Sequence, residues 1–188
     1  VFVGNEYDLM SEKVEFIRQT GTEFVCTQLP REAGEWVYAG CRDATVLCTP
    51  HALNPALYYP DPSTARTVDV GFIGSRHPAY LGDNNRNLML DGAALRAPLL
   101  GMSCDIRFRN EPRDGWARFL RTCRCVVGAE SGTFYLERDG RTMKAAKAYW
   151  RANRAATAEQ IFERFYRRAE NTINGEAVSS RHFDPLGT

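Results

Sequence analysis

The first 49 residues alternate short apolar runs with segments of helical period. Three runs have the length and content of buried strands: residues 1–6, 22–28 and 44–50. Between the first two, Met10, Val14 and Ile17 recur on one helical face. Pro30 is well placed to open a second helix before the third run. This strand–helix alternation predicts a parallel sheet covered by helices.

A proline-rich stretch then interrupts the alternation. It contains Pro50, Pro55, Pro60 and Pro62. Each proline fixes its own φ and disfavours helix at the preceding residue. We therefore predict that residues 50–65 form a hinge linker between two α/β units.

The alternation restarts after the linker. Further strands are predicted at residues 67–75, 103–110, 125–128 and 176–180. Helices are predicted at residues 84–95, at 114–123 with Asp114 as its cap, and at 142–153. A last helix begins at Thr157, where Gln160 completes a capping box. The second half of the chain is thus also predicted to form a parallel α/β unit.

Composition gives few functional clues. The 188 residues include 24 Lys and Arg and 23 Asp and Glu, and a net charge of +1 gives no bulk attraction to nucleic acid or to anionic membranes. No apolar run approaches the ~18 residues of a membrane span, and no signal peptide is evident, so a cytoplasmic protein is expected. The six cysteines lack zinc-like spacing and are interpreted as buried reduced thiols rather than disulfides or metal ligands.

Candidate binding residues follow three of the predicted strands. Ligands of open parallel sheets lie beyond the carboxyl ends of the strands. The candidates are Gly74 and Ser75 at the end of the strand at 67–75, with Arg76, Tyr80, Asp83 and Arg86 after it; Glu130, Ser131 and Gly132 after 125–128; and Arg181, His182 and Asp184 after 176–180. Glycines let backbone approach a pyrophosphate, arginines answer its charge, and a carboxylate can hold ribose hydroxyls. These residue types suit a sugar nucleotide.

Each candidate also has a purely structural interpretation. Gly74 and Gly128 can simply end strands, and Arg76 and Arg86 can be solvated surface charges. His51 is either a catalytic base near the hinge or a turn histidine packed under the linker. The stretch "VGFIGSR" is neither a dinucleotide-binding fingerprint nor a Walker loop, so an oxidoreductase or a P-loop NTPase is poorly supported.

A series of motifs, in this order, resembles bacterial glycosyltransferases of the GT-B fold. The motifs are "VFVGNEYDLMSEKVEFI", "CTQLP", "PHALNP", "DVGFIGSR", "YLGDNNRN", "GAESGTFYLERDG" and "SSRHFDPLGT". The resemblance points to the group found among polysaccharide biosynthesis proteins and CgeB-like transferases. It covers nearly the whole chain and rests on the order and spacing of the motifs.

The resemblance implies two Rossmann-like domains that face each other across a cleft. Residues 1–49 would be the C-terminal part of the acceptor-side domain, 50–65 the hinge, and 66–188 a nucleotide-sugar (donor) domain that is incomplete at its C-terminus. Such an enzyme transfers a sugar from a nucleotide-sugar donor to a saccharide or lipid-linked acceptor, usually without cofactor or metal. The sequence is therefore expected to be a piece of a longer chain, and to be inactive without its missing flanking parts.

The resemblance also assigns roles to individual residues. Arg76 matches the loop that meets the diphosphate, and Glu130 matches a donor-facing loop. Asp184 matches the acidic residue that holds the ribose, where Glu is more frequent and one methylene longer. An alternative remains open, a non-catalytic nucleotide- or sugar-binding α/β module, because His51 is the one acid–base candidate near the hinge.

Overall fold

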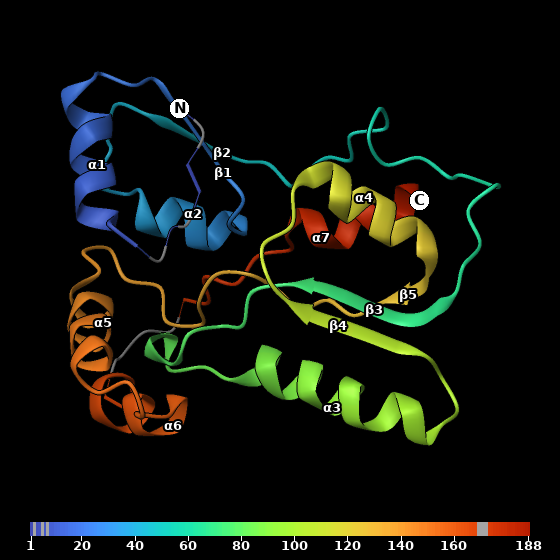
Figure 1. The fold of residues 1–188 in the computed structure, drawn as a ribbon. Helices are drawn as coiled ribbons and strands as arrows, with labels where there is room; N and C mark the ends of the chain where they lie inside the picture. Colours follow the sequence, from blue (N-terminus) through green and yellow to red (C-terminus); the bar gives the residue numbers. More distant parts are fainter. Residues whose placement is uncertain (2, 5, 7, 169–172) are drawn as a thin grey trace. The chain divides into compact units, whose positions relative to one another are not determined.

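The computed structural model describes residues 1, 3, 4, 6, 8–168 and 173–188, which form two compact units (Figure 1). The first unit comprises residues 1–50, 78–84 and 130–178, and the second comprises 51–77, 85–129 and 179–188. Both contain parallel strands with helices, so the predicted α/β class with parallel sheets is confirmed. Among the described residues, no helix is both long and apolar enough to cross a bilayer.

The sheet of the first unit follows the predicted order of elements. Strands β1 (Phe24–Thr27) and β2 (Thr45–Cys48) pair in parallel, and helices α1 (Met10–Gln19) and α2 (Arg31–Val37) precede them in turn. Backbone hydrogen bonds of 2.8 Å also join Cys26 to Val1 and Val3. In the predicted strand 1–6, Phe2 and Asn5 lie outside the described residues.

Two further helices complete the first unit. They are α5 (Arg141–Ala152) and α6 (Ala158–Ile161), and a π-helical turn at Phe162–Tyr166 follows α6. The capping box of α6 is confirmed, because the Thr157 hydroxyl accepts from Gln160 N at 3.3 Å and Gln160 Oε1 accepts from Thr157 N at 3.0 Å.

The second unit is a three-stranded parallel sheet. Its strands β3 (Val68–Gly74), β4 (Cys104–Phe108) and β5 (Cys123–Val126) lie in the order β4-β3-β5. Helices α3 (Asn85–Leu99) and α4 (Arg113–Thr122) cover opposite faces of this sheet (Figure 1). Helix α4 begins one residue before Asp114 and is capped by Pro112, so the predicted Asp114 cap is wrong; this carboxylate instead pairs with Arg118 at 2.9 Å.

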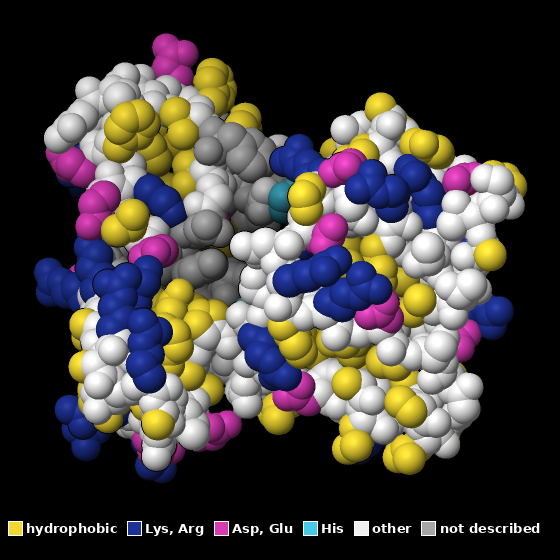
Figure 2. Space-filling view, in the orientation of Figure 1, with side chains coloured by type: hydrophobic (Ala, Val, Ile, Leu, Met, Phe, Trp, Pro, Cys, Tyr) yellow, Lys and Arg dark blue, Asp and Glu magenta, His cyan; other side chains and the backbone are white. Residues whose placement is uncertain are grey.

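Helix α3 presents apolar side chains to solvent as well as to the sheet. Leu88, Leu95 and Leu99 are 60, 70 and 79% exposed, and Figure 2 shows apolar surface over this helix. The face covered by α4 is better packed, because Ile73, Trp116 and neighbouring side chains there form a buried cluster. The better-formed core of this unit is therefore on the α4 side.

The predicted linker packs against this core. Residues 51–67 are turns and extended chain, as the prolines predicted. Tyr58 is 7% exposed within the core, and Leu53 and Leu57 pack on it. Arg121 donates to the Leu57 carbonyl at 2.9 Å and lies 4.0 Å from the Tyr59 ring. The stretch is thus anchored to the second unit along much of its length.

The predicted strand at 176–180 is wrong. Ala177 forms an isolated antiparallel bridge with Ser131 instead, through backbone hydrogen bonds of 2.8 and 3.0 Å. Gly132 permits this pairing: its φ is 108°, and a Cβ there would lie 2.5 Å from the Gly175 carbonyl oxygen. Ser180 instead begins helix α7 (Ser180–Phe183), which a 3₁₀ turn at Asp184–Gly187 follows.

The two units do not follow the predicted division of the chain. Residues 130–178 belong with residues 1–50, whereas the prediction placed them with residues 66–129. The assignment of acceptor-side, hinge and donor domains to residues 1–49, 50–65 and 66–188 stays a prediction.

Candidate functional site at the carboxyl edge of the second sheet

Helix α7 meets the second sheet where its strands end. Arg181 Nη1 donates a hydrogen bond of 2.5 Å to the carbonyl of Ile73, near the end of β3. The guanidinium carbon lies 4.7 Å from the centre of the Trp116 ring. It would lie 3.4 Å from a Cβ placed on Gly74, so the glycine lets the guanidinium approach the strand end. Among the described residues only Nη1 finds an acceptor, which leaves the Nε and Nη2 hydrogens as donors.

Two aromatic side chains hydrogen-bond to Asp184, which directly follows α7. This carboxylate is 5% exposed, and its Oδ2 accepts from Trp116 Nε1 at 3.2 Å. The Tyr58 hydroxyl also hydrogen-bonds to it. Burial raises the pKa of Asp184 above its usual value, against the opposing effect of these hydrogen bonds and of the Arg181 charge. Burial lowers the pKa of Arg181, and Asp184 opposes that shift.

All three histidines belong to the same unit, and His51 and His182 are the two that were predicted as site residues. A Cβ on Gly128, just after β5, would lie 3.8 Å from His182 Nε2, and His182 Nδ1 is 3.3 Å from the Ser179 carbonyl. His51 is half-buried, and this burial lowers its pKa, while the Asp184 charge acts in the opposite direction. His51 is therefore neutral near pH 7 and chemically able to accept a proton.

The arginine of the loop after β3 is paired with a carboxylate of α3. Arg76 donates to both carboxylate oxygens of Asp91 at 3.0 and 2.5 Å, and its guanidinium lies 4.0 Å from the Phe108 ring. These hydrogen bonds raise the pKa of Arg76. Ser75 is exposed, 3.4 Å from Asn110 Oδ1. A diphosphate would have to compete with Asp91 for Arg76.

Arg86 is also engaged within the second unit. Its Nη1 lies 3.2 Å from His77 Nε2, and its guanidinium carbon is 5.5 Å from the centre of the Phe72 ring. The side chain is partly buried. Arg86 is therefore packed against the sheet and is not a fully solvated surface charge.

The remaining predicted site residues belong to the first unit: Tyr80, Asp83, Glu130, Ser131 and Gly132. The Tyr80 carbonyl accepts from the Tyr166 hydroxyl at 2.9 Å. Burial raises the pKa of Glu176, and the charges of Asp83 and Glu130 add to that increase. Within this unit the predicted residues thus gather carboxylates around Glu176.

The second unit brings together eight of the predicted residues: His51, Gly74, Ser75, Arg76, Arg86, Arg181, His182 and Asp184. Sequence reasoning missed Tyr58 and Trp116, which fix Asp184 in place. Trp116 is a core residue at 5% exposure, and its indole N–H needs a buried acceptor. A tryptophan near the start of the helix that follows a strand, with an indole N–H that needs an acceptor, is the sequence signal that could have identified Trp116.

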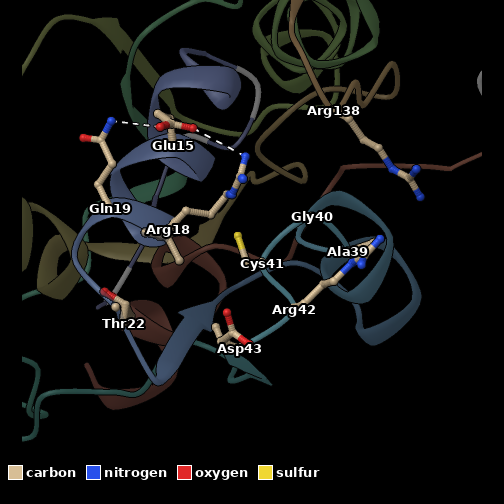
Figure 3. A pocket seen from close by; sticks show the side chains of 13 residues that line it. Glu15, Arg18, Gln19, Thr22, Ala39, Gly40, Cys41, Arg42, Asp43 and Arg138 are labelled. Carbon is tan, nitrogen blue, oxygen red and sulfur yellow. Dashed lines mark hydrogen bonds and ion pairs between the residues drawn. The ribbon is translucent and has the colours of Figure 1, made fainter.

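A pocket in the first unit contains none of the predicted site residues. It measures about 810 Å³ and lies between the end of α1 and the loop from α2 to β2 (Figure 3). Arg18, Arg42 and Arg138 line it, together with Glu15 and Asp43. In Figure 3 Arg18 turns toward Glu15, with which it pairs at 3.5 Å. The pocket is at the amino ends of β1 and β2, opposite the edge at which parallel sheets bind ligands.

Among the described residues, no three His, Cys, Asp or Glu side chains gather as a metal site. All six cysteines are free thiols. Comparison of the chain with protein-family models, with curated proteins and with solved structures found no match. The geometry of the second unit and the motifs of the sequence are the observations that bear on function.

Proposed function

We propose that this chain is the sugar-nucleotide-binding part of a GT-B glycosyltransferase of polysaccharide biosynthesis. In the complete enzyme it would transfer a sugar from a nucleotide-sugar donor to a saccharide or lipid-linked acceptor. The order of the motifs supports this proposal, as do two α/β units built around parallel strands. Cytoplasmic localisation belongs to the same proposal.

One observation carries the proposal furthest, the placement of Arg181 at the end of β3. Its guanidinium keeps unused N–H donors beside Gly74, and His182 lies beside Gly128 after β5. A partly buried guanidinium next to glycine backbone is suited to a diphosphate, because its charge is weakly screened and phosphate oxygens can approach closely. We therefore assign the diphosphate contact to Arg181 in preference to Arg76, because Asp91 is already paired with the Arg76 guanidinium through two hydrogen bonds.

The same geometry changes the role proposed for Asp184. A ribose that binds this carboxylate would have to displace Trp116 or Tyr58. We propose instead that Asp184 holds α7 in place, so that Arg181 and His182 keep their positions at the edge of the sheet. Transfer would then depend on stabilising the departing diphosphate, for which a preorganised cation is effective.

The test is a calorimetric titration with uridine, guanosine, cytidine and adenosine diphosphates and with the matching nucleosides. Replacing Arg181 by Gln should weaken the preferred diphosphate by about 1.5–3 kcal/mol and leave the nucleoside nearly unaffected. Arg76→Gln is the matched control and should bind as the wild type does. Loss of diphosphate binding in Arg76→Gln but not in Arg181→Gln would overturn this assignment. A wild-type chain that binds none of the four would refute the donor site itself.

Binding and catalysis are separated by a second measurement. The full-length product of the gene is assayed for release of nucleoside diphosphate from the sugar nucleotide whose diphosphate binds most tightly. Release that depends on an added saccharide acceptor supports the transferase. Tight binding without any turnover supports the alternative, a non-catalytic binding module.

A further inference from the structure

The positive charge of the chain is concentrated in one segment. Residues 141–168 contain eight Lys and Arg against two Asp and Glu, a net charge of +6, whereas the rest of the chain carries −5. This segment forms α5, α6 and the π-helical turn of the first unit. Figure 2 shows Lys and Arg side chains gathered over α5. The near-zero net charge of the chain therefore hides a strongly basic surface.

Half of these basic residues are neutralised within the unit. The pairs are Lys144–Glu12, Lys147–Asp8, Arg141–Asp139 and Arg167–Glu163, at 2.5–2.8 Å. The other four are Arg151, Arg154, Arg164 and Arg168, all exposed. Among the described residues, none of these four has a carboxylate partner. Glu12 belongs to α1 and Asp8 precedes it by two residues, so these two pairs connect α5 to the start of α1.

Half-buried aromatic side chains lie among the unpaired arginines. Arg154 lies 4.2 Å from the centre of the Trp150 ring, and Arg164 lies 4.6 Å from that of Tyr149. The Tyr149 ring is in turn 5.5 Å from that of Phe165. We call this surface the arginine–aromatic patch: Tyr149, Trp150, Arg151, Arg154, Arg164, Phe165 and Arg168.

We propose that the arginine–aromatic patch is a docking surface for the anionic face of a lipid bilayer. Guanidinium groups pair with lipid phosphates, and half-buried Trp and Tyr rings favour the boundary between headgroups and acyl chains. Basic residues near an anionic leaflet are attracted to it, and each increases the affinity for the membrane about fivefold. This inference goes beyond the proposed sugar transfer and does not depend on it.

The arrangement of the rings favours a bilayer over a nucleic acid. Single-stranded nucleic acids bind such surfaces by stacking bases on open aromatic faces. Here guanidinium groups lie against the rings of Trp150 and Tyr149. Both rings also pack in the aromatic cluster of the unit, so their faces are not open for base stacking, whereas the guanidinium groups can still bind phosphate.

Cosedimentation with lipid vesicles tests the proposal on the intact chain. The protein should bind vesicles of phosphatidylcholine mixed with phosphatidylglycerol, fail to bind phosphatidylcholine alone, and be released by salt. Replacing Arg151, Arg154, Arg164 and Arg168 together by Gln should reduce binding at least tenfold. The matched control replaces four exposed arginines of the second unit, Arg96, Arg109, Arg113 and Arg118, and should bind as the wild type does.

Several outcomes would overturn the proposal. Equal binding to both kinds of vesicle would show that charge is not recognised. Equal loss in the two quadruple variants would show that overall charge, not the patch, is responsible. Binding of single-stranded oligonucleotides by a chain that does not bind anionic vesicles would identify the patch as a nucleic-acid surface. Circular dichroism of both variants confirms that each is folded before its binding is interpreted.

Discussion

Replacing Asp184 by Ala removes the acceptor on which two buried donors depend. Trp116 is 5% exposed and Tyr58 is 7% exposed, and both hydrogen-bond to this carboxylate. An orphaned buried donor costs about 1–3 kcal/mol. Loss of a carboxylate that burial penalises offsets part of this cost. We expect a net loss of about 2 kcal/mol, or roughly 10 °C in the unfolding midpoint of a unit of this size.

Asp184→Asn is the matched control, because the amide keeps an acceptor oxygen and removes the charge. Burial raises the folded-state pKa of Asp184, so the unfolded chain loses its proton at a lower pH than the folded chain. The contribution of Asp184 to stability therefore falls as pH rises from about 3.8 through the raised folded value, and is constant above it. Asp184→Asn should gain stability relative to wild type over that window.

Urea unfolding followed by Trp116 fluorescence measures these effects in the second unit, once Trp36 and Trp150 of the first unit are replaced by Phe. The Trp116 indole N–H resonance should also shift in Asp184→Ala and remain near its wild-type position in Asp184→Asn. Equal unfolding midpoints for wild type and Asp184→Ala, with an unshifted indole resonance, would refute the buried contact between α7 and α4.

Other predictions concern single features of the two units. Gly82→Ala should destabilise the first unit more than Gly21→Ala does in thermal unfolding, because both have positive φ but only at Gly82 would a Cβ meet an aromatic ring, at 2.4 Å; equal costs would contradict this. Hydrogen bonding from Lys144 is the largest of the effects that lower the pKa of Glu12 to about 2, so its stabilising effect is lost as pH falls from 4.5 toward 2; in Lys144→Met, nuclear magnetic resonance titration should find that pKa raised from about 2 toward 4.5, because the hydrogen bonds from Ser11 and from the Glu12 backbone remain. Burial raises the pKa of Cys123 to about 11, so the exposed Cys125 should react first with a thiol reagent, and faster labelling of Cys123 would show that β5 is not packed as described.

Local signals predicted most of the secondary structure. The helical spacing of apolar residues predicted α1, in which Met10 and Ile17 are buried. The capping box at Thr157 predicted the start of α6. The apolar run at 67–75 became the central strand β3, because a strand of a parallel sheet with helices over both faces is apolar on both. Such features depend on residues close in sequence, and a single chain is sufficient to find them.

Features that depend on distant partners could not be predicted in this way. Residues 176–180 have strand-like composition, but Ser131 takes the backbone hydrogen bonds of Ala177. Arg76 follows a strand end as a phosphate-binding arginine should, but Asp91, on the next helix, accepts both of its hydrogen bonds. The inward orientation of Asp184 depends on Trp116, 68 residues earlier in the chain.

The proposed function requires that a nucleoside diphosphate binds at the carboxyl edge of the second sheet. Amide chemical shifts, recorded while the labelled chain is titrated with the diphosphate that binds most tightly, test it directly. We expect saturable shifts at Gly74, at Gly128 and along 180–182. These shifts should be smaller in Arg181→Gln and unchanged in Arg76→Gln. Shifts confined to the pocket around Gly21, Gly40 and Arg42, or no shifts with any nucleotide, would contradict it.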